Sequence, residues 1–244
     1  MILNCKKRAR VAAIAAFSIS EAILFSAVIF GGGGKWLEYS SVLLALVFSL
    51  IFINKSPSGI AIPLGLTFTA LADICLVILS PMKMTLGVFL FLITQLSYAA
   101  FLYAEEKNER TRHYHIYTRV ALALLFEGAM LIVLGRDADL LTAVTMLYFA
   151  NLVANAILSY GIRPRIFNLG LILFILCDIF VGLSVLIDDY LPVRDGGLID
   201  SIVNPDFNVV WLFYIPSQTL IALTVLFKRM NAERKAESES ENNP

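Results

Sequence analysis

Long apolar stretches alternate with short polar segments along nearly the whole chain. Apolar stretches of about 17–25 residues are typical of transmembrane helices, because about 20 helical residues cross the hydrocarbon core of a bilayer. Eight such stretches are present, at residues 11–30, 37–53, 59–79, 84–104, 119–135, 138–160, 165–187 and 207–228. The pattern therefore predicts an all-α fold, a polytopic membrane bundle of eight transmembrane helices.

The composition agrees with a membrane protein. The chain has 244 residues, of which 59% are hydrophobic and 16% are charged, and its mean hydropathy is +0.79. A soluble domain is nearer half apolar and a quarter charged, so the excess of apolar side chains must face lipid. The first apolar stretch follows the basic segment KKRAR, but it exceeds the apolar region of a signal peptide. It is therefore interpreted as a retained first helix.

Basic residues indicate the orientation of the helices, because cytosolic loops are enriched in Lys and Arg. With a cytosolic N-terminus, eight spans place 15 Lys and Arg residues inside and 4 outside. We therefore predict one integral membrane domain over residues 1–230, with both termini cytosolic, and a disordered charged tail over residues 231–244. The predicted location is the cell (inner) membrane if the source is bacterial. The longest outer loop, residues 188–206, is acidic.

Ionisable and amide side chains recur at similar intervals within the apolar stretches. The pairs are Glu21 and Glu127, Asp73 and Asp178, and Gln95 and Gln218. The two acidic pairs are 106 and 105 residues apart, and the long outer loop accounts for the wider separation of the two glutamines. Four spans separate the members of each pair, so the chain is expected to contain a parallel 4+4 internal repeat.

Two aspartates lie among apolar side chains, Asp73 in LADICLVIL and Asp178 in LFILCDIFVGL. A charged group at the bilayer centre costs about 2.5–3.5 kcal/mol, so we expect both to face the interior of the bundle and to be functional. Helical spacing groups other polar and aromatic side chains on three helix faces. These faces are Gly87, Phe91, Gln95 and Tyr98; Tyr148, Asn151, Asn155 and Ser159; and Trp211, Tyr214 and Gln218.

Together these faces are predicted to line a polar cavity. A simpler interpretation also exists for the amides, because Asn and Gln hydrogen bonds between membrane helices stabilise by about 0.6 kcal/mol on average without any further role. Glu21 and Glu127 can likewise be neutral acids that bind a neighbouring helix.

Several other chemistries are not favoured by the sequence. His113 and His115, the only histidines, are predicted to lie in a solvated cytosolic turn, which disfavours a zinc hydrolase with buried His ligands. The segment GGGGK at 31–35 lacks the remainder of a phosphate-binding loop and is interpreted as a flexible connection. Cys75 and Cys177 are expected to be packing residues, and nucleic-acid binding has no support.

Four short motifs occur in a fixed order along the spans. They are A-D-I-x-L in the third span, G-x-x-x-F-x-x-x-Q-x-x-Y in the fourth, L-G-L-I-L-F-I-L-C-D in the seventh and Y-x-x-x-Q-x-L-I in the eighth. With these motifs the chain resembles the YhhN-type lysoplasmalogenase family of eight-span membrane proteins. Members of that family usually carry Gly-Asp, His and Ser-Asp where this chain has Ala72-Asp73, Gln95 and Cys177-Asp178.

The resemblance implies hydrolysis of the vinyl ether bond of lysoplasmalogens to a fatty aldehyde and a glycerophospho-base, without metal or cofactor. Enol ethers hydrolyse by protonation of carbon, which requires a carboxylic acid kept protonated by burial or by a like charge. Asp73 and Asp178 are the predicted catalytic pair, one protonated and one ionised. The predicted substrate-binding residues are Gln95, Tyr98, Asn151, Asn155, Tyr214, Gln218, Glu21 and Glu127.

The expected partners are a lysophospholipid substrate and membrane lipids. Two other classes remain open at this point. Buried acids on repeated helices are also typical of proton-coupled transporters, and the replacement of the family His by Gln95 is compatible with a non-catalytic lipid-binding protein. Aldehyde release separates the enzyme from both alternatives, and proton-dependent flux in liposomes identifies the transporter.

Overall fold

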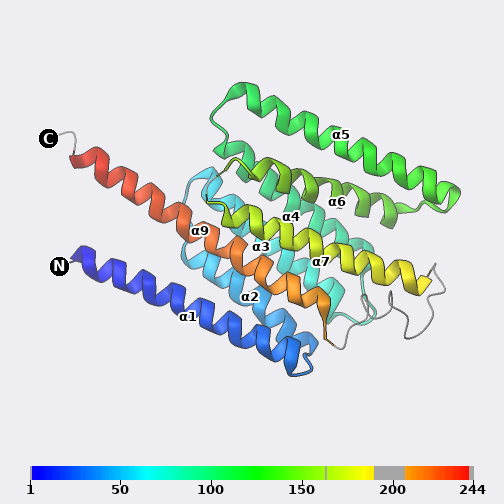
Figure 1. The fold of residues 1–244 in the computed structure, drawn as a ribbon, viewed down its shortest axis with the longest axis horizontal. Helices are drawn as coiled ribbons and strands as arrows, with labels where there is room; N and C mark the ends of the chain where they lie inside the picture. The colour runs from blue at the N-terminus through cyan, green and yellow to red at the C-terminus, as the bar shows by residue number, and fades with distance from the viewer. Residues whose placement is uncertain (1, 163, 190–206, 242–244) are drawn as a thin grey trace.

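The computed structural model of the chain describes residues 2–162, 164–189 and 207–241, and within them it is helical without β-strands. Eight long helices make up this part of the molecule (Figure 1). They are α1 (Ile2–Phe30), α2 (Lys35–Ile51), α3 (Pro57–Asp73), α4 (Met84–Glu105), α5 (Glu109–Leu134), α6 (Leu140–Ser159), α7 (Ile166–Asp189) and α9 (Val209–Glu241). The predicted all-α helical bundle is confirmed. Each predicted span falls on one of these helices, except that the third span also includes residues 74–78, which follow α3 as a π-helical turn.

Seven of the eight helices in the described part of the chain are long and apolar enough to cross a membrane. The eighth, α2, has 17 residues, which is at the lower limit for a span. The protein is thus a multi-pass membrane protein. The start of α1 and the end of α9 lie at the same end of the bundle (Figure 1), as an even number of passes requires. The assignment of this end to the cytosol stays a prediction, and the acidic outer loop lies almost wholly outside the described residues.

Local sequence signals explain several helix boundaries. Ser56 caps α3, where its hydroxyl accepts a hydrogen bond of 3.0 Å from the backbone N–H of Gly59, and Pro57 occupies the first helical position, where its missing N–H costs nothing. Between α1 and α2, Gly32 and Gly33 have φ values of 82° and 56°. Glycine tolerates this left-handed backbone without steric cost, so the GGGG segment forms a tight connection between the two helices.

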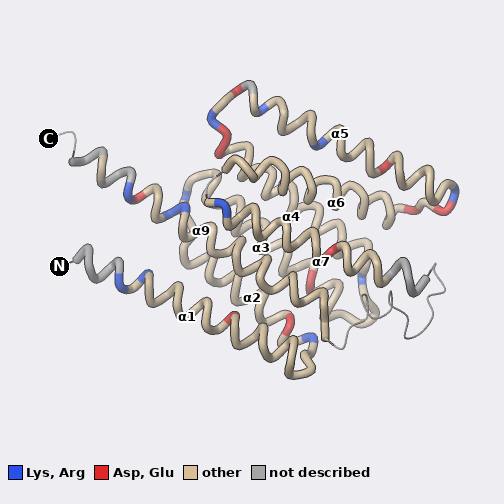
Figure 2. The backbone as a smooth tube through the Cα atoms, in the orientation of Figure 1, with Lys and Arg blue, Asp and Glu red and all other residues tan. Residues whose placement is uncertain are grey.

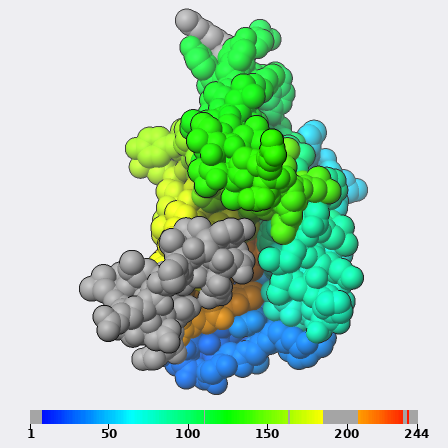
Figure 3. All heavy atoms as spheres, turned by 90° about the vertical axis from the view of Figure 1, so that its right-hand side faces the viewer, coloured from blue at the N-terminus to red at the C-terminus, as the bar shows by residue number. Residues whose placement is uncertain are grey.

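The helices pack mainly as sequential pairs, with α3 on α4 and α7 on α9, and α4 and α6 join these pairs across the bundle. In contrast, α5 packs mainly against α6 and stands at one edge of the molecule (Figures 1 and 3). Charged residues lie mostly towards the helix ends (Figure 2). The bundle centre therefore holds few charged side chains, and the acidic residues inside it stand out.

A close approach of α3 and α4 at Gly65 sets the spacing of this central pair. A methyl group added at Gly65 would lie 2.3 Å from Cε1 of Tyr98, which is fully buried. We therefore expect Gly65→Ala to lower the free energy of unfolding by about 1–3 kcal/mol, the usual cost of overpacking. Thermal unfolding of the detergent-solubilised protein measures this change.

Gly128 in α5 provides the matched control, because nothing lies within 4 Å of an added methyl group there. The variant Gly128→Ala is expected to be unchanged or slightly more stable, as alanine favours helix. Equal stabilities of the two variants would contradict the close contact at Gly65.

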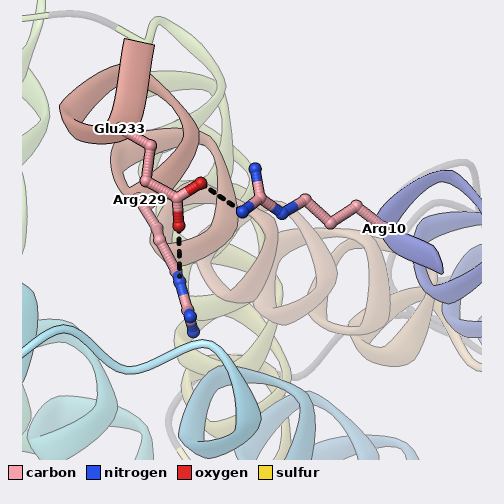
Figure 4. Close-up of polar contacts among 3 residues, drawn as sticks. All are labelled: Arg10, Arg229 and Glu233. Carbon is pink, nitrogen blue, oxygen red and sulfur yellow. Dashed lines mark hydrogen bonds and ion pairs between the residues drawn. The ribbon is translucent and has the colours of Figure 1, made fainter. Parts of the chain in front are cut away.

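Ion pairs join α9 to neighbouring helices at the end that holds both termini. Glu233 binds Arg10 of α1 and Arg229 one turn earlier on α9 (Figure 4), and Lys228 binds Glu105 at the end of α4. Helix α9 continues past residue 230 to Glu241. The division at residue 230 into a membrane domain and a disordered tail stays a prediction.

Candidate functional site

Asp73 is the last residue of α3, and its side chain is buried with 3% exposure. The hydroxyl of Tyr214, on α9, donates a hydrogen bond of 2.8 Å to its Oδ2. The next residues form η1 (Ile74–Ile78), a π-helical turn in which the N–H of Leu79 donates to the carbonyl of Ile74. Such turns are rare and are frequent at functional sites, so the helix changes its geometry directly after the aspartate.

Asp178 lies within α7 and has a similar partner. The hydroxyl of Tyr148, on α6, donates a hydrogen bond of 2.5 Å to its Oδ2. Tyr148 is buried with 6% exposure, whereas Asp178 is half-buried. Each aspartate therefore accepts a hydrogen bond from a tyrosine of another helix. The second oxygen of each carboxyl group has no hydrogen-bond partner in the described part of the chain, so it can exchange a proton with a bound molecule.

Aromatic rings connect the two aspartates. The ring centroid of Phe174 lies 5.4 Å from that of Tyr214 and 6.5 Å from that of Tyr148, and Phe91 lies 5.7 Å from both Tyr148 and Phe174. The structure thus connects Asp73 and Asp178 through their tyrosines and a set of contacting aromatic rings. We call these two acids the carboxyl pair.

The two asparagines predicted on α6 lie further along the same helix face and bind two other helices. The Asn155 Nδ2 donates to Oε1 of Gln95, on α4, at 2.9 Å. The guanidinium of Arg119, on α5, donates to Oδ1 of Asn151 at 3.3 Å and to Oδ1 of Asn155 at 2.7 Å. These four side chains form a continuous polar network inside the bundle.

Arg119 is the member of this network that sequence reasoning missed. It was counted with the basic residues of a cytosolic loop, although it is also the first residue of the predicted fifth span. The structure places it inside α5, which begins ten positions earlier at Glu109. Its position at the boundary of an apolar stretch was the available signal, because a long side chain there can turn inward as readily as outward.

The remaining predicted binding residues are distributed more widely. Tyr98 is fully buried and packs on Phe167, with ring centroids 5.6 Å apart. Gln218 is fully buried, and among the described residues neither of its amide atoms has a hydrogen-bond partner. Glu21 is buried and accepts a hydrogen bond of 2.6 Å from the Ser41 hydroxyl at the α1–α2 contact. These three side chains are not hydrogen-bonded to the carboxyl pair.

Glu127 differs from its predicted counterpart Glu21, because it is half-buried on α5. The prediction of a solvated turn for the two histidines was wrong, because both lie within α5. His113 is exposed, whereas His115 is buried. Its side chain is 3% exposed and its Nε2 is 3.9 Å from a carboxylate oxygen of Glu106. Cys75 and Cys177 are both buried, as predicted.

A polar cavity of about 340 Å³ lies at the end of the bundle that holds both termini. Its lining includes three cationic side chains and one acidic side chain, together with the N-terminal turn of α3. The polar lining residues are Asn54, Ser56, Ser58, Glu105, Lys107, Lys228, Arg229 and Asn231. The cavity shares no residue with the carboxyl pair or the Arg119 network.

The fold and the buried acids define the class of protein, a multi-pass helical membrane protein with two tyrosine-bound carboxyl groups inside its bundle. The profile of the YhhN family matches residues 35–225, and the chain belongs to this family. The match extends from α2 to about the middle of α9 and thus includes both aspartates and their tyrosines. No curated protein and no solved structure matches the chain.

Proposed function

We propose that the protein hydrolyses the vinyl ether bond of lysoplasmalogens to a fatty aldehyde and a glycerophospho-base, with Asp73 and Asp178 as the catalytic acid and base. The carboxyl pair supports this proposal, because a buried and a half-buried carboxyl group connected through aromatic side chains suit proton transfer in both directions. Membership of the YhhN family is consistent with it. Because the pair lies inside the bundle, a single-chain lipid entering laterally from the bilayer suits the site. The membrane of a bacterial source would be the inner one.

The reaction needs one proton donor and one proton acceptor. The protonated carboxyl group transfers its proton to the vinyl carbon distal to the ether oxygen, which gives an oxocarbenium ion. The ionised carboxyl group removes a proton from water as the water oxygen bonds to the cationic carbon. The resulting hemiacetal then breaks its bond to the glycerol oxygen. That oxygen gains a proton, the hemiacetal hydroxyl loses one, and the aldehyde is released with the original protonation state restored.

The surroundings of the pair suit a cationic transition state. An ionised carboxyl group stabilises the oxocarbenium ion electrostatically, and this effect is larger in a buried site than in water. The faces of Tyr148, Phe174 and Tyr214 add favourable contacts, because aromatic rings attract cations. Each tyrosine hydroxyl also fixes the direction of its carboxyl group, which leaves the free oxygen to face the substrate.

We also infer that the two acids occupy equivalent positions in a 4+4 internal repeat. The packing of the helix pairs supports this interpretation, since α1 packs on α2 as α5 packs on α6, and α3 packs on α4 as α7 packs on α9. The aspartates lie on α3 and α7, the third helix of each half. In such an arrangement the site forms where the two halves meet.

The test of the reaction uses the full-length protein in detergent with a lysoplasmalogen and with the corresponding 1-alkyl lysophospholipid, which lacks the double bond. We expect aldehyde release from the first substrate and no product from the second. In D2O the aldehyde should carry one deuterium on the carbon next to the carbonyl group, because that carbon receives the catalytic proton. Mass spectrometry of the trapped aldehyde measures both outcomes.

Failure to release aldehyde from lysoplasmalogens with any head group would overturn the proposal and favour lipid binding or transport. Release of aldehyde without deuterium at that carbon would retain a hydrolase but contradict protonation of the vinyl carbon.

A further inference from the structure

Arg119 is a half-buried cation at the contact of α5 with α6, and no acidic side chain of the described residues pairs with it. Its guanidinium donates to the amide oxygens of Asn151 and Asn155, and it takes part in no ion pair within residues 2–162, 164–189 and 207–241. On the same helix, His115 lies one turn earlier, and its Nε2 is 3.9 Å from a carboxylate oxygen of Glu106. A cation in a membrane bundle normally pairs or marks a binding site.

Hydrogen-bond donors in this network exceed acceptors. A guanidinium carries five N–H donors, and Arg119 uses two nitrogens for the two asparagines. Gln95 is fully buried, and its Nε2 has no hydrogen-bond partner in the described part of the chain. Its Oε1 is held by Asn155, the same residue that binds Arg119. Arg119 and Gln95, which are both hydrogen-bonded to Asn155, thus offer unused donors that an anion with several oxygens would satisfy.

The position of the network along α6 fits a particular anion. Tyr148, which binds Asp178, and the two asparagines share one helix face, and a rise of 1.5 Å per residue places Asn151 about 5 Å and Asn155 about 10 Å along the axis from Tyr148. In a lysophospholipid five bonds separate the ether oxygen on glycerol from phosphorus, a span of roughly 6 Å at ordinary bond lengths. A head group that extends along α6 from a vinyl ether bound at Asp178 therefore brings its phosphate to the level of Asn151, which binds Arg119.

We infer that Arg119 and Gln95 form the phosphate-binding site for a lysophospholipid bound at the carboxyl pair. This inference rests on the proposed function for its choice of lipid, but it concerns binding, which is measured without turnover. Arginine is suited to the task because its planar fork matches two phosphate oxygens. The site then selects substrates that carry a phosphate group next to glycerol, whatever the rest of the head group.

The alternative role of Arg119 is structural, as a tie between α5 and α6. The two roles differ in their dependence on the ligand, because a structural tie affects every ligand equally. The test therefore compares a short-chain 1-alkyl lysophospholipid with the 1-alkylglycerol of the same chain length, which lacks the phosphate. Both are soluble and resist hydrolysis, and calorimetric titration of the full-length protein in detergent gives the two Kd values.

We expect Arg119→Gln to raise the Kd for the lysophospholipid about tenfold, because the variant loses charged hydrogen bonds to the phosphate. The Kd for the alkylglycerol is expected to stay unchanged. Arg119→Lys should restore part of the affinity, because it keeps the charge without the fork. Asn151→Asp should reproduce the phosphate-selective loss while it strengthens the tie between the helices, because the new carboxylate neutralises Arg119.

Arg229→Gln is the matched control, because Arg229 lines the separate cavity at the end of the bundle. Its two Kd values are expected to equal those of the wild type. A phosphate-selective loss in Arg229→Gln but not in Arg119→Gln would overturn the inference and place the phosphate in that cavity. Equal losses for both ligands in Arg119→Gln, with unaltered affinity in Asn151→Asp, would overturn it in favour of the structural tie. Phosphate-selective binding without any aldehyde release would sustain the site and reject the hydrolase.

Discussion

Exchange of Asp178 or Asp73 for asparagine is expected to lower kcat for aldehyde release about 1,000-fold. General acid and base groups contribute about 10²–10⁴-fold each, and asparagine has the same shape but neither donates an acidic proton nor accepts one from water. The fold should tolerate both changes, because the asparagine oxygen can still accept the hydrogen bond of Tyr148 or Tyr214. Initial rates with a lysoplasmalogen, together with thermal unfolding of each variant, measure the effect.

Asp139→Asn is the matched control for this experiment. Asp139 is exposed and caps the N-terminus of α6, where its carboxylate accepts a hydrogen bond from the N–H of Thr142. Asparagine caps helices equally well, so this variant should keep full activity. The double variant of Asp73 and Asp178 should be only slightly slower than either single one, because residues that act as a unit are not additive. Robust activity in a folded single variant would remove that aspartate from the mechanism.

The tyrosines provide the second large effect. Tyr148→Phe and Tyr214→Phe are each expected to lower kcat about 10- to 100-fold, because a hydrogen bond to a charged group contributes about 1.5–3 kcal/mol. The loss arises from a carboxyl group that is no longer held in one direction. Steady-state kinetics with each variant measures kcat and KM separately, and we expect kcat to carry most of the change.

Tyr160→Phe is the control for this pair of substitutions, because Tyr160 is 70% exposed at the end of α6. Its kinetics should match those of the wild type. If Tyr148→Phe raised KM alone and left kcat intact, the hydroxyl would belong to substrate binding rather than to the alignment of Asp178.

The helices and their buried faces could be predicted from the sequence. Long apolar stretches indicate the membrane helices, and polar or aromatic side chains at helical spacing within them indicate the face that is turned away from lipid. The faces predicted for the fourth, sixth and eighth spans are all buried in the structure, including Gln95, Asn155 and Gln218. Helix ends were less well predicted. Hydropathy identifies the residues that contact lipid. Helices α1, α5 and α9 extend beyond these residues, because backbone hydrogen bonds also form outside the apolar stretch.

The pairing of side chains between helices was not accessible from one sequence. Helical spacing tells which face of α6 is buried, but not that Tyr148 binds Asp178 while Asn155 binds Gln95. The inward direction of Arg119 was missed for a related reason, since a count of basic residues treats each as a loop residue. The difference between Glu21 and Glu127 has the same origin, because burial depends on the neighbouring helix and α5 stands at the edge of the bundle.

The π-helical turn after Asp73 has a consequence for how this end of the protein tolerates change in length. A π turn contains about one residue more than an α turn. The side chains after Asp73 are therefore rotated by about 100° around the helix axis relative to their directions in a regular α-helix. The offset carries Leu76 against Gly87, where an added methyl group would lie 2.5 Å from its Cγ. Loss of a single residue from this turn would restore regular α-helix and reorient the outer end of the segment, while Asp73 and all residues before it kept their register.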